Sequence, residues 1–202
     1  MKRLLRIAVV TIVLFFGVIQ ATPTIAISIG FDPSSQIVDI GDLFDIDVVV
    51  SGLDAAGEIV SAYDLDVLYD DAVLSATAVT FGLDLGDPFF FEVFNGFDIS
   101  TPGLVDFAQL SFLSDLELNA IQGDTVTLAT LYFQVVGLGT SLLTFDPDPA
   151  FGIDVKGNNA SLLAFSEVGT ARVAPVPEPT TLLLTVSGLA GLFGMRRKPR
   201  KR

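Results

Sequence analysis

The sequence predicts an all-β protein, an antiparallel β-sandwich, and three observations favour this class. Apolar and polar residues alternate at period two in several segments between residues 25 and 173, where no convincing helical period is present. Clusters of glycine, aspartate and proline separate these segments at spacings typical of antiparallel strands. The chain has no cysteine, so an apolar core rather than disulfides must stabilise the fold.

Three segments show the alternation most clearly. Their apolar faces consist of Phe44, Ile46, Val48 and Val50 in the first, Tyr63, Leu65, Val67 and Tyr69 in the second, and Ala129, Leu131, Phe133 and Val135 in the third. Shorter runs near residues 105–112, 142–145 and 168–173 repeat the pattern. Since most residues between the apolar ones are polar, each strand is expected to bury one face and expose the other.

The charges are segregated along the chain. Residues 32–177 contain 23 acidic residues and only two basic ones, Lys156 and Arg172, whereas both termini are basic. Such an acidic domain repels phosphate backbones, which excludes nucleic acid as its partner and favours cations or basic partners. The chain also lacks histidine, which removes the commonest general base and the commonest zinc ligand.

Residues 1–26 have the three parts of a secretory signal peptide. A basic start, Met1 to Arg6, precedes an apolar run from Ile7 to Ile19, and small residues follow at Ala21 and Ala26. As a helix the apolar run would rise only ~20 Å, which is short of the bilayer core. We therefore expect a signal helix that directs export, rather than an N-terminal anchor, with the exact cleavage site left open.

The C-terminal end also has three parts. The motif Pro177-Glu178-Pro179 precedes an uncharged segment, Thr180 to Met195, and a basic cluster, Arg196 to Arg202. The uncharged segment would rise ~24 Å as a helix and could cross a bilayer if the arginines snorkel. The basic cluster should stay cytoplasmic, which places the acidic domain outside. On these grounds alone, a plain C-terminal transmembrane anchor is the alternative interpretation.

This C-terminal segment resembles a PEP-CTERM sorting domain. The resemblance rests on Val-Pro-Glu-Pro-Thr at residues 176–180, on an apolar segment with three glycines, and on the Arg-Arg-Lys that begins the basic tail. It implies recognition and processing at Pro177, Glu178 and Pro179 by an exosortase, a membrane-embedded enzyme similar to cysteine proteases. The membrane stage would then be transient. The resemblance also implies a Gram-negative bacterium, with the product at the cell envelope, on the surface or outside the cell.

The order of strands and turns in the middle of the chain resembles a cohesin domain, a jelly-roll-like sandwich related to certain carbohydrate-binding modules. The resemblance rests on Ile40-Gly41-Asp42, on residues 62–70, on residues 128–135 and on the turn 137–141. Asp71 departs from the family, which often has proline there. These two resemblances divide the chain into a signal peptide (1–26), a cohesin-like domain (27–174) and a sorting segment (175–202).

Two further clusters are candidate sites. Asp146, Asp148 and Asp154 lie in a proline-containing segment similar to a calcium loop, because hard cations prefer clustered oxygen ligands. A proline-stiffened turn without metal is the alternative, and calcium is the only cofactor considered. Phe89-Phe90-Phe91, with Phe94 and Phe97, is the densest aromatic cluster; it either feeds the core or forms an exposed docking patch for a protein or a sugar.

The sequence thus predicts an exported, exosortase-sorted protein of the cell surface or extracellular matrix. Its middle domain is expected to be a non-catalytic binding module for a protein or polysaccharide. A structural component of the biofilm or exopolysaccharide without a discrete ligand is one alternative. A glycoside hydrolase is another, since that chemistry needs only two suitably spaced carboxylates. No pair of acids stands out in the sequence, and no catalytic residue is assigned.

Overall fold

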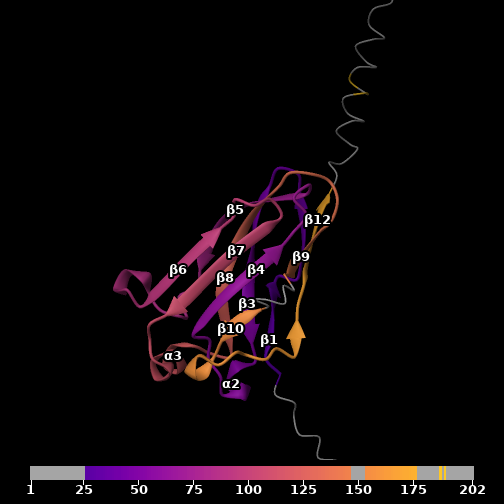
Figure 1. Ribbon diagram of the computed structural model, residues 1–202. Coiled ribbons are helices and arrows are strands. Elements are labelled where there is room, and N and C mark those ends of the chain that lie inside the picture. The colour runs from indigo at the N-terminus through magenta and orange to yellow at the C-terminus, as the bar shows by residue number, and fades with distance from the viewer. Residues whose placement is uncertain (1–25, 147–152, 177–186, 188, 190–202) are drawn as a thin grey trace, which may run out of the picture.

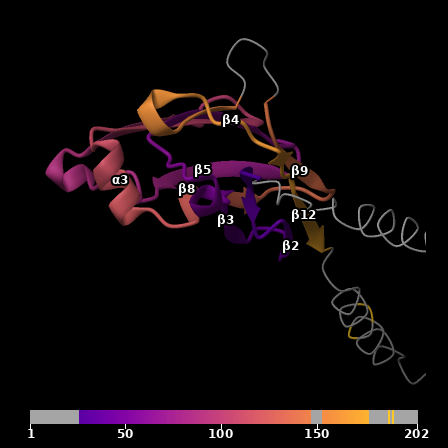
Figure 2. The same cartoon turned by 90° about the horizontal axis from the view of Figure 1, so that it is seen from below.

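Two β-sheets packed face to face form the domain (Figures 1 and 2). The computed structural model describes residues 26–146, 153–176, 187 and 189. The strands are β1 (Ser28–Asp32), β2 (Ser35–Asp39), β3 (Leu43–Ser51), β4 (Ala62–Leu68), β5 (Leu74–Phe81), β6 (Val93–Asp98), β7 (Leu104–Ser111), β8 (Thr125–Val135), β9 (Ser141–Phe145), β10 (Asp154–Lys156), β11 (Glu167–Val168) and β12 (Ala171–Val176). The predicted all-β sandwich is confirmed.

The two sheets have different strand orders. One sheet has five strands in the order β11-β1-β3-β8-β5. The other has seven, in the order β2-β12-β9-β4-β7-β6, with β10 pairing with β4. Most neighbours are antiparallel, but β1 pairs with β11, and β2 with β12, in parallel. Two parallel strands require a long connection between them. Here the two parallel pairs bring the first strands of the domain, β1 and β2, beside its last strands, β11 and β12.

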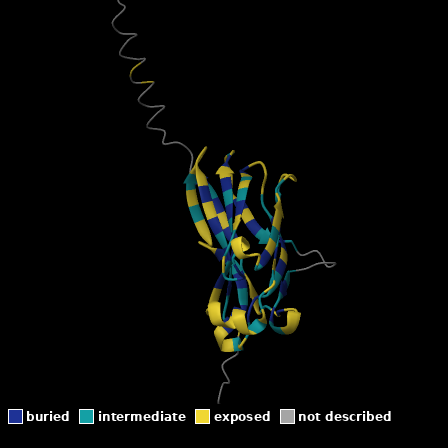
Figure 3. Ribbon diagram, turned by 90° about the vertical axis from the view of Figure 1, so that its left-hand side faces the viewer, coloured by how far each residue is buried: buried dark blue, intermediate teal, exposed yellow. Residues whose placement is uncertain are grey.

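The core lies between the two sheets and uses the predicted apolar faces. Along β3 and β4 buried and exposed residues alternate, as Figure 3 shows for the strands in general. In the five-stranded sheet Ile46 lies opposite Leu131, and both side chains are fully buried. In the seven-stranded sheet Leu65 lies opposite Phe107, also buried. Side chains from the two inner faces therefore meet in one continuous core.

The structure also contains short helices that the alternation did not predict. They are α2 (Leu53–Ala56), α3 (Asp115–Ile121) and the 3₁₀ turns η1 (Pro88–Phe90) and η2 (Asn158–Ala160). The longest of them, α3, has seven residues, too few to produce a helical period in the sequence. Ser114 caps this helix by accepting a hydrogen bond from the amide of Glu117, whose carboxylate in turn accepts from the amide of Ser114. This capping box is readable in the sequence as Ser-x-x-Glu.

The predicted targeting segments lie almost entirely outside the described residues. Of the signal peptide the structure describes only Ala26, and of the segment after Val176 only Ser187 and Leu189. Within the described part of the chain, no helix has the length and apolar character needed to cross a membrane. β12 continues to Val176, two residues beyond the predicted end of the sandwich at residue 174.

Candidate binding face

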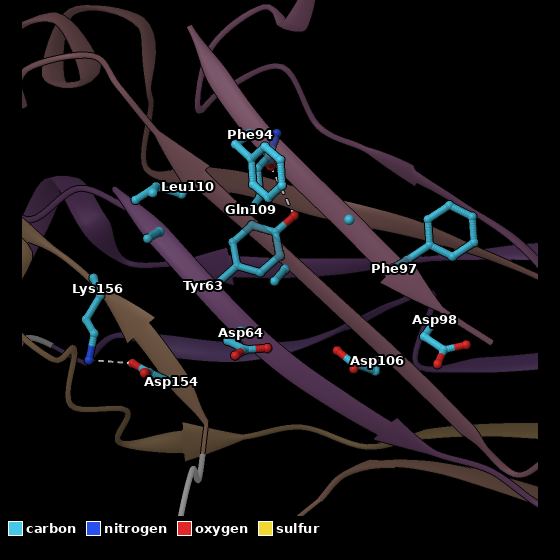
Figure 4. Close-up of a pocket in the computed structure, with 13 residues that line it drawn as sticks. Tyr63, Asp64, Phe94, Phe97, Asp98, Asp106, Gln109, Leu110, Asp154 and Lys156 are labelled. Carbon is cyan, nitrogen blue, oxygen red and sulfur yellow. Dashed lines mark hydrogen bonds and ion pairs between the residues drawn. The ribbon is translucent and has the colours of Figure 1, made fainter. Parts of the chain in front are cut away.

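The outer face of the seven-stranded sheet has an open hollow above β6, β7 and β4, which we call the outer-face groove. Its volume is about 460 Å³. The residues that line it are Ala62, Tyr63, Asp64, Phe94, Gly96, Phe97, Asp98, Asp106, Ala108, Gln109, Leu110, Asp154 and Lys156. These residues come from the neighbouring strands β6, β7, β4 and β10, and Figure 4 shows Lys156 and Asp154 together at one side.

The strand register explains why the face is hollow. Gly96 on β6 lies opposite Ala108 on β7, and Ala108 lies opposite Asp64 on β4. Two of the three residues in this row have small side chains or none. Neighbouring rows on the same face lie two residues away along each strand, because side chains of a strand alternate between faces. The small residues therefore form a floor, and the rows on either side form the walls.

The wall on one side of the floor is apolar. Phe94 lies opposite Leu110, two residues from Gly96 and Ala108 respectively. Phe94 is 69% exposed and Leu110 is 47% exposed. Phe112 continues this side and is also exposed; its amide donates a 2.7 Å hydrogen bond to the carbonyl of Glu92. Exposed apolar side chains that adjoin one another are typical of a surface that contacts a partner.

The wall on the other side is acidic. Asp98 on β6 lies directly opposite Asp106 on β7, and Asp64 of the floor row lies beside them and adds a third carboxylate, as Figure 4 shows. Burial, and then the negative charges of Asp64 and Asp98, raise the pKa of Asp106 above its ordinary value. The Ser100 amide, which donates a 2.7 Å hydrogen bond to the Asp98 carboxylate, lowers the pKa of Asp98. Like charges opposite one another destabilise a sheet.

Only one basic residue lines the groove. Lys156 Nζ lies 2.6 Å from Asp154 Oδ1, and both residues belong to β10. This ion pair neutralises Asp154 and leaves Asp64, Asp98 and Asp106 as the negative side of the groove. The groove lining holds four aspartates and one lysine, so its acidic residues outnumber its basic ones by three. The groove therefore presents an uncompensated negative charge next to an apolar wall.

A buried polar pair fixes the sheet beneath the groove. Tyr63, only 3% exposed, donates from its hydroxyl toward the carbonyl of Leu128 at 2.7 Å and the Oε1 of Gln109 at 3.0 Å. Leu128 belongs to β8 in the other sheet, so this contact joins the two layers. Burial raises the pKa of Tyr63 far above its ordinary value, which keeps the hydroxyl protonated as a donor. The floor of the groove is thus rigidly positioned.

Replacing Asp106 by asparagine is expected to stabilise the domain at neutral pH. A raised pKa means that folding favours the protonated carboxyl, so the stability that Asp106 contributes is present at acid pH and lost as the pH rises through its folded pKa. Asp106→Asn removes this loss of stability. The variant should therefore be more stable than the native protein at neutral pH and equally stable at about pH 3. Chemical denaturation at the two pH values measures the free energy of unfolding of both proteins. An equal gain in stability at both pH values would contradict the raised pKa of Asp106.

The predicted aromatic patch is exposed and adjoins the apolar wall. Phe89, Phe90 and Phe91 are 80%, 66% and 87% exposed, and they form η1 and its end just before β6. The carboxylate of Asp87 caps the turn by accepting from the amide of Phe89. Of the two interpretations of this cluster, the structure favours the exposed one over a strand that feeds the core. A role in partner binding stays a prediction.

The predicted calcium loop is described only in part. Asp148 lies outside the described residues, whereas Asp146 follows β9 and Asp154 begins β10. Asp154 is paired with Lys156. Within residues 26–146 and 153–176, no group of three or more acidic side chains is placed to hold a metal ion. Calcium binding by these three aspartates remains an untested prediction.

Of the residues that form the groove, the sequence singled out Phe94 and Phe97, as members of the aromatic cluster, and Asp154, as a candidate calcium ligand. Asp64, Asp98 and Asp106 fit the solvent-exposed faces of strands, and no local pattern marks Gly96 or Ala108. The signal that could have found them is the pairing of β6 with β7, because a Phe-x-Gly-x-Asp pattern opposite an Asp-x-Ala-x-Leu pattern gives a groove with one apolar and one acidic wall. That pairing is not readable from either strand alone.

Comparison with known proteins agrees with both resemblances. Residues 175–198 match the family model of the PEP-CTERM protein-sorting motif. The chain has a PEP-CTERM sorting motif. The match includes Pro177, Glu178 and Pro179, which lie outside the described residues, and it overlaps the last two residues of β12. No curated protein matches the chain.

Solved structures of cohesins have the same architecture. A type II cohesin domain from the cellulosome of Acetivibrio cellulolyticus is 20% identical, with a TM-score of 0.56, and the match covers 75% of this chain and 95% of the cohesin. The sandwich is cohesin-like. The sixth cohesin of scaffoldin B from the same organism, in complex with a dockerin, is 14% identical, with a TM-score of 0.58 and coverage of 75% and 99%. A type I cohesin–dockerin complex from Clostridium thermocellum is 15% identical, with a TM-score of 0.57 and the same coverage.

Proposed function

We propose that the protein is an exported, non-catalytic binding module whose outer-face groove holds a partner protein with an apolar and basic surface. The groove itself is the observation that supports this most directly: an exposed apolar wall, formed by Phe94 and Leu110, stands beside an uncompensated acidic wall. A partner that places aliphatic side chains on the first wall and Lys or Arg on the second complements both. Two of the cohesins with the same fold are themselves bound to dockerins, which agrees with a protein as partner.

The acidic wall lowers the stability of the free domain, and this also supports a binding role. Asp98 and Asp106 lie opposite one another, and burial, followed by the negative charges of Asp64 and Asp98, raises the pKa of Asp106. A basic side chain from a partner would offset these charges. Residues that destabilise the free protein and are relieved by a ligand are typical of functional surfaces, where stability is given up for binding.

The sorting motif supports a location at the cell envelope. The N-terminal residues 1–26 act as signal peptide, and the segment 180–195 inserts in the membrane until the motif at Pro177, Glu178 and Pro179 is processed by an exosortase-type enzyme. The match to the PEP-CTERM motif supports this order of events in a Gram-negative bacterium. The acidic domain, residues 27–174, then faces outward, where it meets its partner.

The groove is less suited to the two alternative ligands. A polysaccharide could stack on Phe94 and donate hydroxyl hydrogen bonds to the carboxylates, but a neutral glycan offers no positive charge to offset them, and an anionic one is repelled. A glycoside hydrolase could use Asp106, with its raised pKa, as acid beside Asp98. Such an enzyme encloses the sugar ring, however, whereas here Asp98 is exposed and the groove is open to solvent. Both alternatives are outcomes of the experiment below.

Affinity capture with matched variants tests the proposal. The full chain, purified in mild detergent, is immobilised and exposed to envelope proteins and, separately, to purified exopolysaccharide of the producing bacterium. Phe94→Ala and the double change Asp98→Asn with Asp106→Asn are compared with control changes on the other sheet, Val168→Ala and Asp45→Asn. We expect one protein to bind the native chain, with an affinity reduced about 30-fold in the Phe94 variant, as for a central hot-spot aromatic, and unchanged in the controls.

Salt provides a second readout. Because the acidic wall supplies part of the attraction, binding should weaken as ionic strength rises, and the Asp98/Asp106 double variant should lose most of that dependence. If the chain captured the polysaccharide but no protein, the partner would be a polysaccharide and the proposed protein partner would be wrong. Release of reducing sugar that depends on Asp106 would establish the hydrolase instead. Equal capture by the native chain and the groove variants would show that the groove is not the binding site.

A further inference from the structure

Exposed apolar side chains also gather at the end of the sandwich where β12 ends. They are Ile37, Ile40, Leu43, Val136 and Leu138, which we call the C-terminal-end patch, and their exposed fractions lie between 43% and 74%. None of them belongs to the outer-face groove. The end of β12 is at the top of Figure 1, whereas α2 and α3 lie at the bottom, so the patch and the helices occupy opposite ends of the domain.

Backbone contacts bring the patch together beside the last residue of β12. Val176 lies opposite Asp39 in the parallel pair of β12 and β2. The turn that follows Asp39 is bonded to the end of β8: the Gly41 amide donates to the carbonyl of Val135 at 2.9 Å, and the Val135 amide to that of Asp42 at 3.0 Å. The turn 39–43 therefore lies between the end of β12 and the residues 136–138, and all five apolar side chains belong to these segments or to adjoining β2.

Very little chain separates this end of the domain from the apolar segment of the tail. Val176 still lies within the sheet, and the uncharged segment begins at Thr180. Four Cα–Cα steps join Val176 to Thr180, so these two residues lie no more than about 14 Å apart even when the chain is fully extended. Once the tail inserts in a membrane, as in the proposed function on which this inference rests, the end of the domain is held against the bilayer. The patch then faces the lipid.

We propose that the C-terminal-end patch docks on the surface of an uncharged, zwitterionic lipid bilayer during the membrane stage. Apolar side chains of this size enter the headgroup boundary by about 5–10 Å, and each gains free energy from the water that it loses. The tail supplies the proximity, so the patch needs only a weak affinity of its own. The docked domain would hold the Pro-Glu-Pro motif at the membrane surface, where a membrane-embedded enzyme can reach it.

The charges around the patch determine the lipid. Asp39 and Asp42 flank Ile40 in the turn, and Asp70 and Asp71 belong to the neighbouring turn, whose Val73 carbonyl accepts a hydrogen bond from the Val136 amide. Anionic headgroups would repel these carboxylates. The same argument disfavours a second copy of the chain, because two such acidic ends would face one another. A zwitterionic surface is the occupant that accepts both the apolar and the acidic residues.

A single introduced tryptophan tests the docking directly, since the chain has no tryptophan of its own. The full chain with Leu138→Trp is reconstituted in vesicles of phosphatidylcholine with brominated acyl chains, which quench tryptophan by contact. We expect quenching and a blue-shifted emission. Leu116→Trp on α3, at the opposite end, should show neither. Thr101→Trp, on the β6–β7 turn next to Gly103, controls for proximity without docking and should be quenched much less.

A fourth position separates this inference from the proposed membrane stage. Leu189→Trp lies within the uncharged segment, and its quenching reports insertion of the tail. If it is not quenched, the membrane stage itself fails, and the docking proposal fails with it. If Leu189→Trp is quenched while Leu138→Trp is not, or if Leu138→Trp and Thr101→Trp are quenched equally, the tail inserts but the patch does not dock. Quenching that appears only when a sorting enzyme is added would assign the patch to that protein and overturn lipid docking.

A change in the patch that leaves the core intact gives an independent readout. Ile37→Ser and Leu43→Ser replace two strongly exposed side chains, so folding should be little affected. Added to Leu138→Trp, they should reduce its quenching but not that of Leu189→Trp. Quenching of Leu138→Trp should also be weaker in vesicles that contain the anionic lipid phosphatidylglycerol. Stronger quenching in these vesicles would contradict the proposed role of the acidic residues.

Discussion

Replacing Phe107 by alanine is expected to lower the free energy of unfolding by about 3–5 kcal/mol. Phe107 is fully buried on the inner face of β7, and its ring packs edge-on against Tyr63, with the ring centroids 5.9 Å apart. Removal of the ring leaves a cavity between the sheets, because the paired strands on both sides of β7 cannot close in to fill it. A loss of this size is a large part of the total stability of an ordinary domain.

Chemical denaturation followed by tyrosine fluorescence measures this loss. Phe112→Ala is the matched control, because it also removes a phenylalanine ring, directly after the end of β7, but this ring is exposed. The free energy of unfolding should change by less than about 0.5 kcal/mol. Similar effects of the two changes would mean that Phe107 is not part of a packed core. Loss of the Tyr63 contact should also lower the stability of the groove floor, so partner binding is best measured on variants that stay folded.

The second large effect is expected at Gly82, directly after β5. A Cβ at this position would overlap the carbonyl oxygen of Thr127 on β8, which is backbone and cannot move aside as a flexible side chain could. The Gly82 amide donates a 3.0 Å hydrogen bond to the carbonyl of Leu128. Gly82→Ala must therefore separate the end of β5 from β8 and should destabilise the domain by roughly 3 kcal/mol, near the upper end for overpacking.

Gly123→Ala is the control for this prediction. Gly123 precedes β8, and nothing lies within 4 Å of an added Cβ there. With no clash, alanine should leave the stability unchanged or raise it by about 0.4–1 kcal/mol through the unfolded state. Denaturation curves of the two variants give the comparison directly. Equal stabilities would contradict the close approach of residues 82 and 127, on which the packing of β5 beside β8 depends.

The candidate site illustrates a conflict between folding and binding within one sheet. The inner residues of β4, β6 and β7 pack in the core. The outer residues of the same strands include three carboxylates that repel one another. Substitution of Asp106 is expected to improve stability, whereas the same substitution is expected to weaken binding. Opposite effects of one change on the two properties would distinguish a functional acidic wall from a surface that merely keeps the protein soluble.

Most of the strands were predictable, because the period of two in the sequence is a local property. The predicted apolar faces of residues 44–50, 63–69 and 129–135 form the buried faces of β3, β4 and β8, except that Tyr69 lies beyond the end of β4 and is only half-buried. Helix α3 was missed although its capping box is visible, since seven residues are too few to show a helical period. The exposure of Phe89, Phe90 and Phe91 was not predictable, because an aromatic run has the same local pattern in a core and on a surface.

The sequence by itself determined the acidic character of the domain, the strands, and the sorting segment with its Pro-Glu-Pro motif. Each of these depends on residues that are close together along the chain. Only the tertiary structure decided that Gly96, Ala108 and Asp64 form one row, and that the turn after Asp39 lies beside the end of β12. The physical reason is that register is set by pairing between distant strands, and a shift of one residue would turn every side chain to the opposite face.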